Sequence, residues 1–315
     1  MLTIDDFLMY LQGDRAYSPR SIRTYADALG SFQNFFQTLD DQLDWDKIDA
    51  DIIRRWMAAE MERGIGARTV AKNLSALRSF YKYLLRMGCV SKNPAHLIKN
   101  PKVHYPLPTF LKQSEMNRLF DDVEFPESFE GVRDRIILLT FYHTGVRVSE
   151  LVGLNVADVS LTTSELKVTG KRNKQRIIPF GKELTDEMAR YVRLRNEWTA
   201  TLEGPLFLGK DKKRMKAESV RNIVSHYLSM VTTQKKKSPH VLRHTFATVM
   251  LNHGADLEAV KSLLGHESVA TTQIYTHTTF AQLQDAYEQA HPRLRRGSGS
   301  EESGAADGGG KCERR

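Results

Sequence analysis

Apolar residues recur at steps of three and four along most of the chain, which is the spacing of a helix that buries one face. The first clear stretch, SPRSIRTYADALGSFQNFFQTL, opens with a Ser-Pro pair typical of a helix start. Its apolar face comprises Ile22, Tyr25, Leu29, Phe32 and Phe36. A second stretch, GARTVAKNLSALRSFYKYLLRMG, repeats the spacing and stops at a glycine. The pattern predicts a helical region from residue 3 to about residue 100.

The pattern changes after residue 92. KNPAHLIKNPKVHYPLP, residues 92–108, has four prolines and little periodicity, which predicts an extended linker. VRDRIILLTFYHTG then predicts a buried helix, and RVSELVGL a short second one. In SELKVTGKRNKQRIIPF, β-branched residues alternate around a polar turn, which predicts a β-hairpin over roughly 165–180. Residues 184–290 return to the helical pattern, so we expect a mostly α fold with a small β-sheet.

Composition narrows the class of protein. A chain of 315 residues, 41% hydrophobic and 27% charged, suggests two globular domains. No apolar run approaches the ~18–20 residues that span a bilayer, and the N-terminus carries acids where a signal peptide carries basic residues, so we expect a cytoplasmic protein. Two cysteines, Cys89 and Cys312, make neither a disulfide framework nor a metal-ligand set. The net charge of +8, concentrated in residues 106–296, favours a polyanionic partner.

Several polar residues in the second half could act together on a phosphate. Arg147 starts a helix, where free N–H groups favour an anion. His240 and Arg243, three apart in SPHVLRHTFAT, share a helix face and suit a phosphate clamp. Lys171 stands at the predicted hairpin tip, where a lysine of lowered pKa can donate a proton.

The stretch LLGHESVATTQIYTH adds His266 and Tyr275. A tyrosine hydroxyl, with a pKa near ~10, is a poor nucleophile unless the developing charge is stabilised. Two arginines and one or two histidines suit the negative charge that grows on a phosphodiester under attack. Together these residues predict phosphoryl transfer without a metal or other cofactor. A zinc pair at His240 and His244 is the rival interpretation, but Val241 stands where a metalloprotease needs glutamate.

These motifs resemble the tyrosine recombinase (phage integrase) family, and most of all the bacterial Xer recombinases. The matching pieces are TGVRVSEL, VTGKRNKQRIIPFG, SPHVLRHTFATVMLNHGADLEAVKSLLGH and TTQIYTH, in the family's order. The resemblance implies a helical SAM-like core-binding domain over 1–92, a linker over 93–108 and an α+β catalytic domain over 109–294. Residues 295–315 fall outside the resemblance, and their composition, rich in Gly, Ser and Glu, predicts a disordered tail.

The resemblance also implies a role for each residue. Tyr275 is the nucleophile that joins the DNA 3′ phosphate, and Lys171 is the proton donor; because the hairpin lacks the expected second glycine, Lys174 is the alternative donor. Arg147 and Arg243 are the catalytic arginines. His240 and His266 complete the site.

The same family implies the partners. Its members clamp double-stranded DNA between two domains, so the basic side of the second helix, at Arg68, Lys72, Arg78, Lys82 and Arg86, is expected to meet phosphates. Four protomers, of one recombinase or two, assemble on two DNA sites. The segment FAQLQDAYEQAH, 280–291, would pack into a neighbour or, alternatively, fold back on its own chain. No membrane contact is expected.

Other classes of protein fit the sequence less well. A non-catalytic DNA-binding protein would lack one of the six site residues, and a helix-turn-helix regulator would not spread chemistry from 147 to 275. A type IB topoisomerase is disfavoured by the compact two-domain layout, and a metallo-hydrolase by the lack of carboxylates near the histidines. Within the family, chromosome dimer resolution is expected, with a transposon or phage integrase or a DNA invertase as the alternative.

Overall fold

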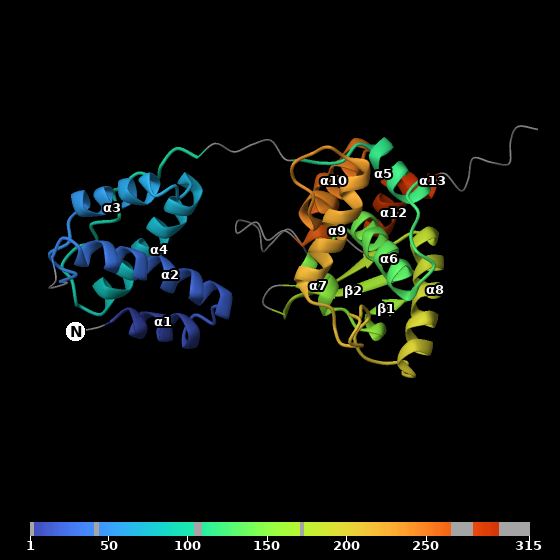
Figure 1. Ribbon diagram of the computed structural model, residues 1–315, viewed down its shortest axis with the longest axis horizontal. Coiled ribbons are helices and arrows are strands. Elements are labelled where there is room, and N and C mark those ends of the chain that lie inside the picture. The colour runs from blue at the N-terminus through green and yellow to red at the C-terminus, as the bar shows by residue number, and fades with distance from the viewer. Residues whose placement is uncertain (1–2, 41–43, 104–108, 171–172, 266–279, 296–315) are drawn as a thin grey trace, which may run out of the picture. The chain divides into compact units, whose positions relative to one another are not determined.

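The computed structural model describes residues 3–40, 44–103, 109–170, 173–265 and 280–295, with the side chains of 280–283 and 294–295 excepted. The chain divides into two compact units, Met1–Pro106 and Leu107–Arg315 (Figure 1). Within the described ranges, no helix is both long and apolar enough to cross a membrane. The expected fold class, mostly α with a small β-sheet, is confirmed.

In the ranges that the structure describes, the first unit consists of four helices around an aromatic core. The helices are α1 (Ile4–Gly13), α2 (Pro19–Gln37), α3 (Ala50–Glu62) and α4 (Ala67–Arg86). Thr3, Ser18 and Asp49 accept backbone N–H bonds at the starts of the first three, as N-cap side chains do. The rings of Trp45 and Phe80 lie 4.8 Å apart in the core. The predicted helical periodicity of this region is therefore confirmed.

The segment expected to be a free linker begins as part of this first unit. Ala95 and Ile98 are buried in its core. The side chain of Arg78 on α4 holds the segment by donating to the carbonyls of Ala95 and Ile98 and to the side chain of Asn100. The prediction of an extended linker starting at residue 93 is therefore wrong for residues 93–100, because apolar side chains between the prolines pack against α4.

The basic residues of α4 differ in what they contact: some bind other residues of the first unit, and others are exposed. Arg78 is occupied by the segment just described, and Arg86 lies over the ring of Tyr10, with its guanidinium carbon 4.4 Å from the ring centre. Lys72 and Lys82 are exposed. Arg78 thus already donates to three groups of its own unit, and contact of this side of α4 with phosphates stays a prediction.

The second unit surrounds one long buried helix, α6, with the other helices. Residues 136–144 of α6, IILLTFYHT, are buried throughout, which confirms the predicted buried helix. Helices α8 and α10 pack against it (Figure 1). The helices here are α5 (Gln113–Asp121), α6 (Phe129–Thr144), α7 (Val148–Gly153), η1 (Val156–Asp158), α8 (Lys182–Thr199), α9 (Ala217–Val231), α10 (Pro239–Asn252), α11 (Leu257–Leu264), α12 (Phe280–Ala290) and α13 (Pro292–Arg295).

A three-stranded antiparallel sheet completes this unit. Its strands are β1 (Val159–Ser160), β2 (Glu165–Thr169) and β3 (Gln175–Pro179), in that order. β2 and β3 pair from Glu165 opposite Pro179 to Thr169 opposite Gln175, which confirms the predicted hairpin. Leu166, Val168 and Ile178 fill the buried face, as the alternating sequence predicts.

The C-terminal helices pack on the second unit of the same chain. α12 lies against α10, α11 and β3. Tyr287 and His291 are buried in the core of the second unit, where the rings of His291 and His143 stack 4.4 Å apart. Of the two expectations for residues 280–291, the single chain adopts the intramolecular one, because this position buries both rings within its own core.

This docking is expected to weaken in mild acid. Burial lowers the pKa of His143 and of His291, although Glu183 on α8 opposes the shift at His143. The groups facing the pair are Glu183, Arg293, Tyr142, Tyr287 and His253. The undocked histidines bind protons below a pKa of about 6.5 while the docked ones stay neutral. The docked state is therefore favoured above about pH 6.5 and loses stability as the pH falls below it.

Hydrogen exchange of the α12 amides, corrected for the intrinsic rate at each pH, measures this effect. Protection of α12 is expected to drop between about pH 7.5 and about pH 5.5, on either side of the histidine pKa. His291→Phe keeps an aromatic ring without a titrating group and should show a smaller drop. Equal drops in both proteins would contradict the prediction.

Candidate active site

Arg147 stands in the tight turn between α6 and α7. α6 ends at Gly145, whose φ of 58° lies in the left-handed region that favours glycine. Arg147 is the N-cap of α7, so the predicted helix start is where the structure places it. Its guanidinium donates to Glu150 Oε1 at 2.8 Å and to the carbonyl of Gly265 at 2.9 Å. The side chain remains 40% exposed, so an external anion can reach it.

Arg243 on α10 lies deeper in the same region. Its Nη1 donates to the carbonyl of Gly145 and its Nη2 to that of Leu264, both at 2.7 Å. The residue is only 6% exposed. Burial lowers the pKa of Arg243, and the nearby charge of Arg147 lowers it further, to about 10. The guanidinium is therefore still protonated near neutral pH.

Glu150 is the carboxylate that joins this region to the β-sheet. Arg176 on β3 donates Nη1 and Nη2 to its two oxygens at 3.0 and 2.9 Å, and the backbone N–H of Arg147 donates to Oε2 at 2.8 Å. Burial alone would raise the pKa of Glu150, but the bonds from Arg176 and Arg147 outweigh it and hold the pKa at about 2. Glu150 is therefore ionised at any working pH.

Sequence reasoning did not single out Glu150. A signal for it was present, because Glu150 stands three residues after the N-cap Arg147, which is the capping-box spacing. Its pairing with Arg176 had no such signal, because these residues are 26 positions apart.

His240 occupies the first turn of α10 and is exposed, whereas Arg243, three residues on, is buried. The Nε2 atoms of His240 and His244 lie 3.0 Å apart. Burial lowers the pKa of His244, and the neighbouring His240 and Arg243 lower it further, so a neutral His244 is a suitable acceptor for a hydrogen on His240. For His240 Nε2 to reach a phosphate oxygen, this contact has to break.

The two histidines are also the pair that could have held zinc. Across the ranges that the structure describes, no three His, Cys, Asp or Glu side chains come together as a possible metal site. His240 and His244 therefore form a pair without a third ligand in those ranges.

Three of the predicted site residues, Lys171, His266 and Tyr275, lie outside the described residues. Their described neighbours are informative. A Cβ added to Gly170, directly before Lys171, would lie 3.4 Å from Glu150 Oε1. Gly265, directly before His266, gives its carbonyl to Arg147. The chain therefore passes beside the arginines immediately before two of the three residues.

The geometry suits the binding of a tetrahedral anion. Arg147 and Arg243 each use two of their five N–H donors in the bonds described above. Donors therefore remain on both guanidinium groups, which the protein backbone and Glu150 hold in fixed positions. Fixed donors of this kind stabilise charge that develops in a transition state without having to reorganise.

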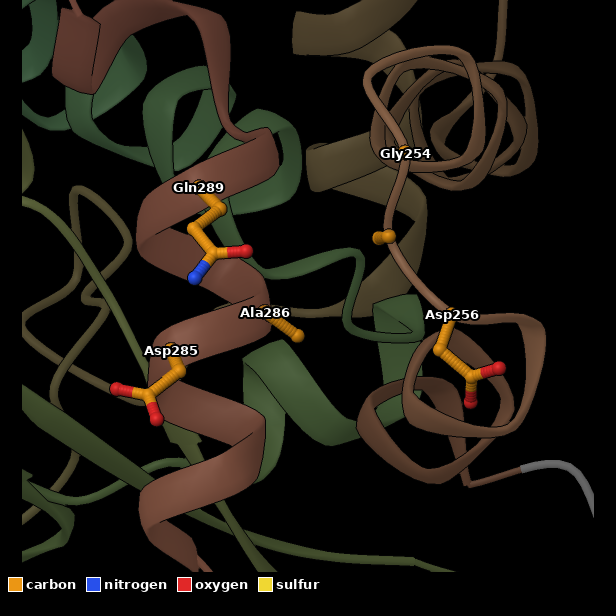
Figure 2. A pocket seen from close by; sticks show the side chains of 6 residues that line it. Gly254, Asp256, Asp285, Ala286 and Gln289 are labelled. Carbon is orange, nitrogen blue, oxygen red and sulfur yellow. The ribbon is translucent and has the colours of Figure 1, made fainter.

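A separate hollow lies at the opposite end of α11. Its volume is about 270 Å³, and it is lined by the turn from Gly254 to Asp256 and by Asp285, Ala286 and Gln289 of α12 (Figure 2). Asp256 and Asp285 give this cavity negative charge, which does not suit a phosphate. The arginine cluster and the cavity are therefore different places on the molecule.

Comparison with known proteins places this fold and site in a family. The profile of the phage integrase family matches residues 109–282, and that of the phage integrase N-terminal SAM-like domain matches residues 4–88. The chain belongs to the phage integrase family, the tyrosine recombinases.

Its similar relatives include several proteins named tyrosine recombinase XerC. The chain is 40% identical to that of Pelobacter propionicus, over 94% of this chain and 97% of the relative. It is 36% identical to that of Chlorobaculum tepidum, over 92% of this chain and 94% of the relative.

Solved structures share the fold. The XerH site-specific recombinase bound to a palindromic difH substrate, in a post-cleavage complex, matches with a TM-score of 0.69 and 21% identity, over 91% of this chain and 85% of that one. A lambda integrase (75–356) dimer bound to a COC′ core site matches with a TM-score of 0.65 and 16% identity, over 85% of this chain and 94% of that one.

Proposed function

We propose that this protein is a site-specific tyrosine recombinase that cuts and rejoins double-stranded DNA through a 3′-phosphotyrosyl intermediate. The main support is that Arg147 and Arg243 both bind backbone carbonyls at the end of α11, those of Gly265 and Leu264. The next residues along the chain lead to His266 and Tyr275. Family membership and the XerC relatives support the same activity.

In the proposed reaction Tyr275 gives up its hydroxyl proton to water, and its oxygen attacks the scissile phosphorus and forms a P–O bond. The bond from phosphorus to the 5′ oxygen breaks, and Lys171 gives that oxygen a proton, with Lys174 as the alternative donor. Arg147, Arg243, His240 and His266 bind the non-bridging oxygens, whose negative charge grows as the tyrosine attacks. The phosphotyrosine conserves the bond energy, so rejoining needs no ATP, and the scheme uses no metal or other cofactor.

The biological setting proposed is resolution of chromosome dimers in the cytoplasm at cell division. XerC relatives that match along almost the whole chain favour this role over that of a mobile-element integrase or invertase. We assign DNA clamping to residues 1–92, against which residues 93–100 pack, and catalysis to 109–294, with a tail over 295–315. The working assembly would be a tetramer that binds two DNA sites. Its protomers would be four copies of this chain, or copies of this chain together with a second recombinase. Lambda integrase, whose fold is similar, forms a tetramer on a Holliday junction.

Trapping the covalent intermediate tests the proposal. The substrate is a nicked duplex that carries the chromosomal dimer-resolution site of the host genome, so that cleavage releases a short strand and cannot reverse. With EDTA present, wild-type protein is expected to form a protein–DNA adduct that resists denaturation. Mass spectrometry should then locate the nucleotide on the peptide containing Tyr275.

Three results would count against the proposal. An adduct at another residue would remove Tyr275 as the nucleophile, and an adduct that needs a divalent cation would remove the metal-free mechanism. A nicked duplex of scrambled sequence is the control: equal adduct formation on both duplexes would contradict site specificity.

A further inference from the structure

Three arginines from three different elements bind three consecutive backbone carbonyls at the end of α11. Arg176 of β3 donates Nε to the carbonyl of Leu263 at 2.7 Å. Arg243 of α10 donates to that of Leu264, and Arg147 at the start of α7 to that of Gly265. The last carbonyls of a helix have no partner within it and carry its negative dipole end, so cations are favourable there.

Arg176 differs from the other two in what else it touches. Its side chain is 16% exposed, against 40% for Arg147. Three of its five N–H donors are already engaged, two by Glu150 and one by Leu263. Gly265 also lies against it, because a Cβ added there would stand 3.0 Å from Arg176 Nη1. Arg176 therefore faces the protein interior rather than an incoming phosphate.

The structure assigns Arg176 the role of a positioning residue, which fixes Arg147 and the 263–265 turn from behind without touching the DNA. This inference rests on the proposed function. Both arginines bind Glu150. Arg176 donates to both carboxylate oxygens through its guanidinium, whereas Arg147 donates to Oε1 through its guanidinium and to Oε2 through its backbone N–H. Arg176 thereby supplies much of the positive charge that Glu150 requires and leaves Arg147 available for a phosphate.

Loss of Arg176 should have two consequences. Glu150 would keep only Arg147 as a cationic partner within the described residues, so Arg147 would be drawn toward the carboxylate and away from the substrate. The carbonyl of Leu263 would lose its donor, which would loosen the turn that leads into residue 266. A misplacement of about 1 Å is enough to slow an enzyme by about 10²-fold.

The first measurement compares Arg176→Gln with wild type in single-turnover formation of the covalent adduct. We expect the variant to react about 10–100-fold more slowly, with DNA affinity within about twofold. Because the buried Glu150 loses a partner, the thermal midpoint should fall, so both proteins are assayed at a temperature at which they are folded. The matched control is Arg135→Gln, because Arg135 on α6 also binds a glutamate and a backbone carbonyl, Glu187 and that of Phe120. This control should cleave at the wild-type rate. Cleavage by Arg176→Gln within about twofold of wild type would overturn the assignment.

A double-mutant cycle separates positioning from simple structural support. If Arg176 acts through Glu150, removing the carboxylate charge as well should leave little further loss, so Arg176→Gln with Glu150→Gln should react no more slowly than the slower single variant. Losses that multiply would show that Arg176 does not act through Glu150 and would overturn the assignment.

A third readout does not depend on cleavage. Hydrogen exchange at the amide of Gly265 should rise in Arg176→Gln and stay unchanged in Arg135→Gln, because the turn loses its Leu263 anchor. If wild type forms no adduct, the proposed function fails while this result still decides whether Arg176 holds the turn. Unchanged exchange in Arg176→Gln would overturn the assignment on its own.

Discussion

Arg243→Ala is expected to form the covalent DNA adduct about 10²–10³-fold more slowly than wild type, the loss typical when one fixed donor to a transition state is removed. Arg243 is buried and already bound to two backbone carbonyls, so its position is set before DNA arrives. Because the phosphate gains charge during attack, this fixed cation matters more in the transition state than in the bound substrate. The rate of the chemical step should therefore fall far more than DNA affinity does.

The measurement is a single-turnover time course on the nicked duplex. Tyr275→Phe, which lacks the proposed nucleophilic oxygen, gives the background signal. Arg243→Lys keeps a positive charge but cannot reach both carbonyls, so it should recover little of the lost rate. Alanine also leaves the carbonyls of Gly145 and Leu264 without this donor, so thermal unfolding must be followed alongside. A lysine variant as fast as wild type would show that charge alone suffices and that the fixed geometry does not matter.

Gly145→Ala is expected to lower the free energy of unfolding by about 2–5 kcal/mol, from backbone strain and overpacking together. The φ of 58° disfavours any side chain, and an added Cβ would lie 2.5 Å from Phe246 Cδ1 and 2.8 Å from a methyl group of Leu264. Both neighbours are buried, so neither can move away without cost. Chemical denaturation of the full chain measures the loss.

Substitutions at two further glycines separate backbone strain from overpacking as causes of the lost stability. Gly254 has a φ of 88° but nothing within 4 Å of an added Cβ, so Gly254→Ala tests backbone strain alone. Gly153 has neither a positive φ nor a close neighbour, so Gly153→Ala should be nearly neutral. If Gly145→Ala cost no more than Gly254→Ala, the contact with Phe246 would not be a tight one.

The regular elements were predictable because local sequence determines them. The steps of three and four in α2 and α4, the mainly apolar stretch IILLTFY of α6 and the alternation in β2 were sufficient to predict these elements. The turn at Gly145 and the helix start at Arg147 were likewise predictable, because a glycine between two helical patterns marks a boundary.

The contacts that hold the site together were not predictable from residue spacing. Arg78 and Arg176 each stand among other basic residues, and nothing in the sequence separates an arginine bound to protein from one available to DNA. Leu263 and Leu264 contribute through their carbonyls, which every residue type possesses. The residue types at these positions therefore do not indicate which backbone carbonyls position the arginines.

The charges around Glu150 favour a phosphate that is being attacked over a phosphate that is only bound. Among the described residues of the site, the guanidinium groups of Arg147, Arg176 and Arg243 face one carboxylate, which leaves an excess of two positive charges. A phosphodiester at rest brings one negative charge, whereas the same phosphate under attack approaches two. The charge of this arginine–glutamate cluster therefore balances that of the reacting phosphate more closely than that of the intact DNA backbone.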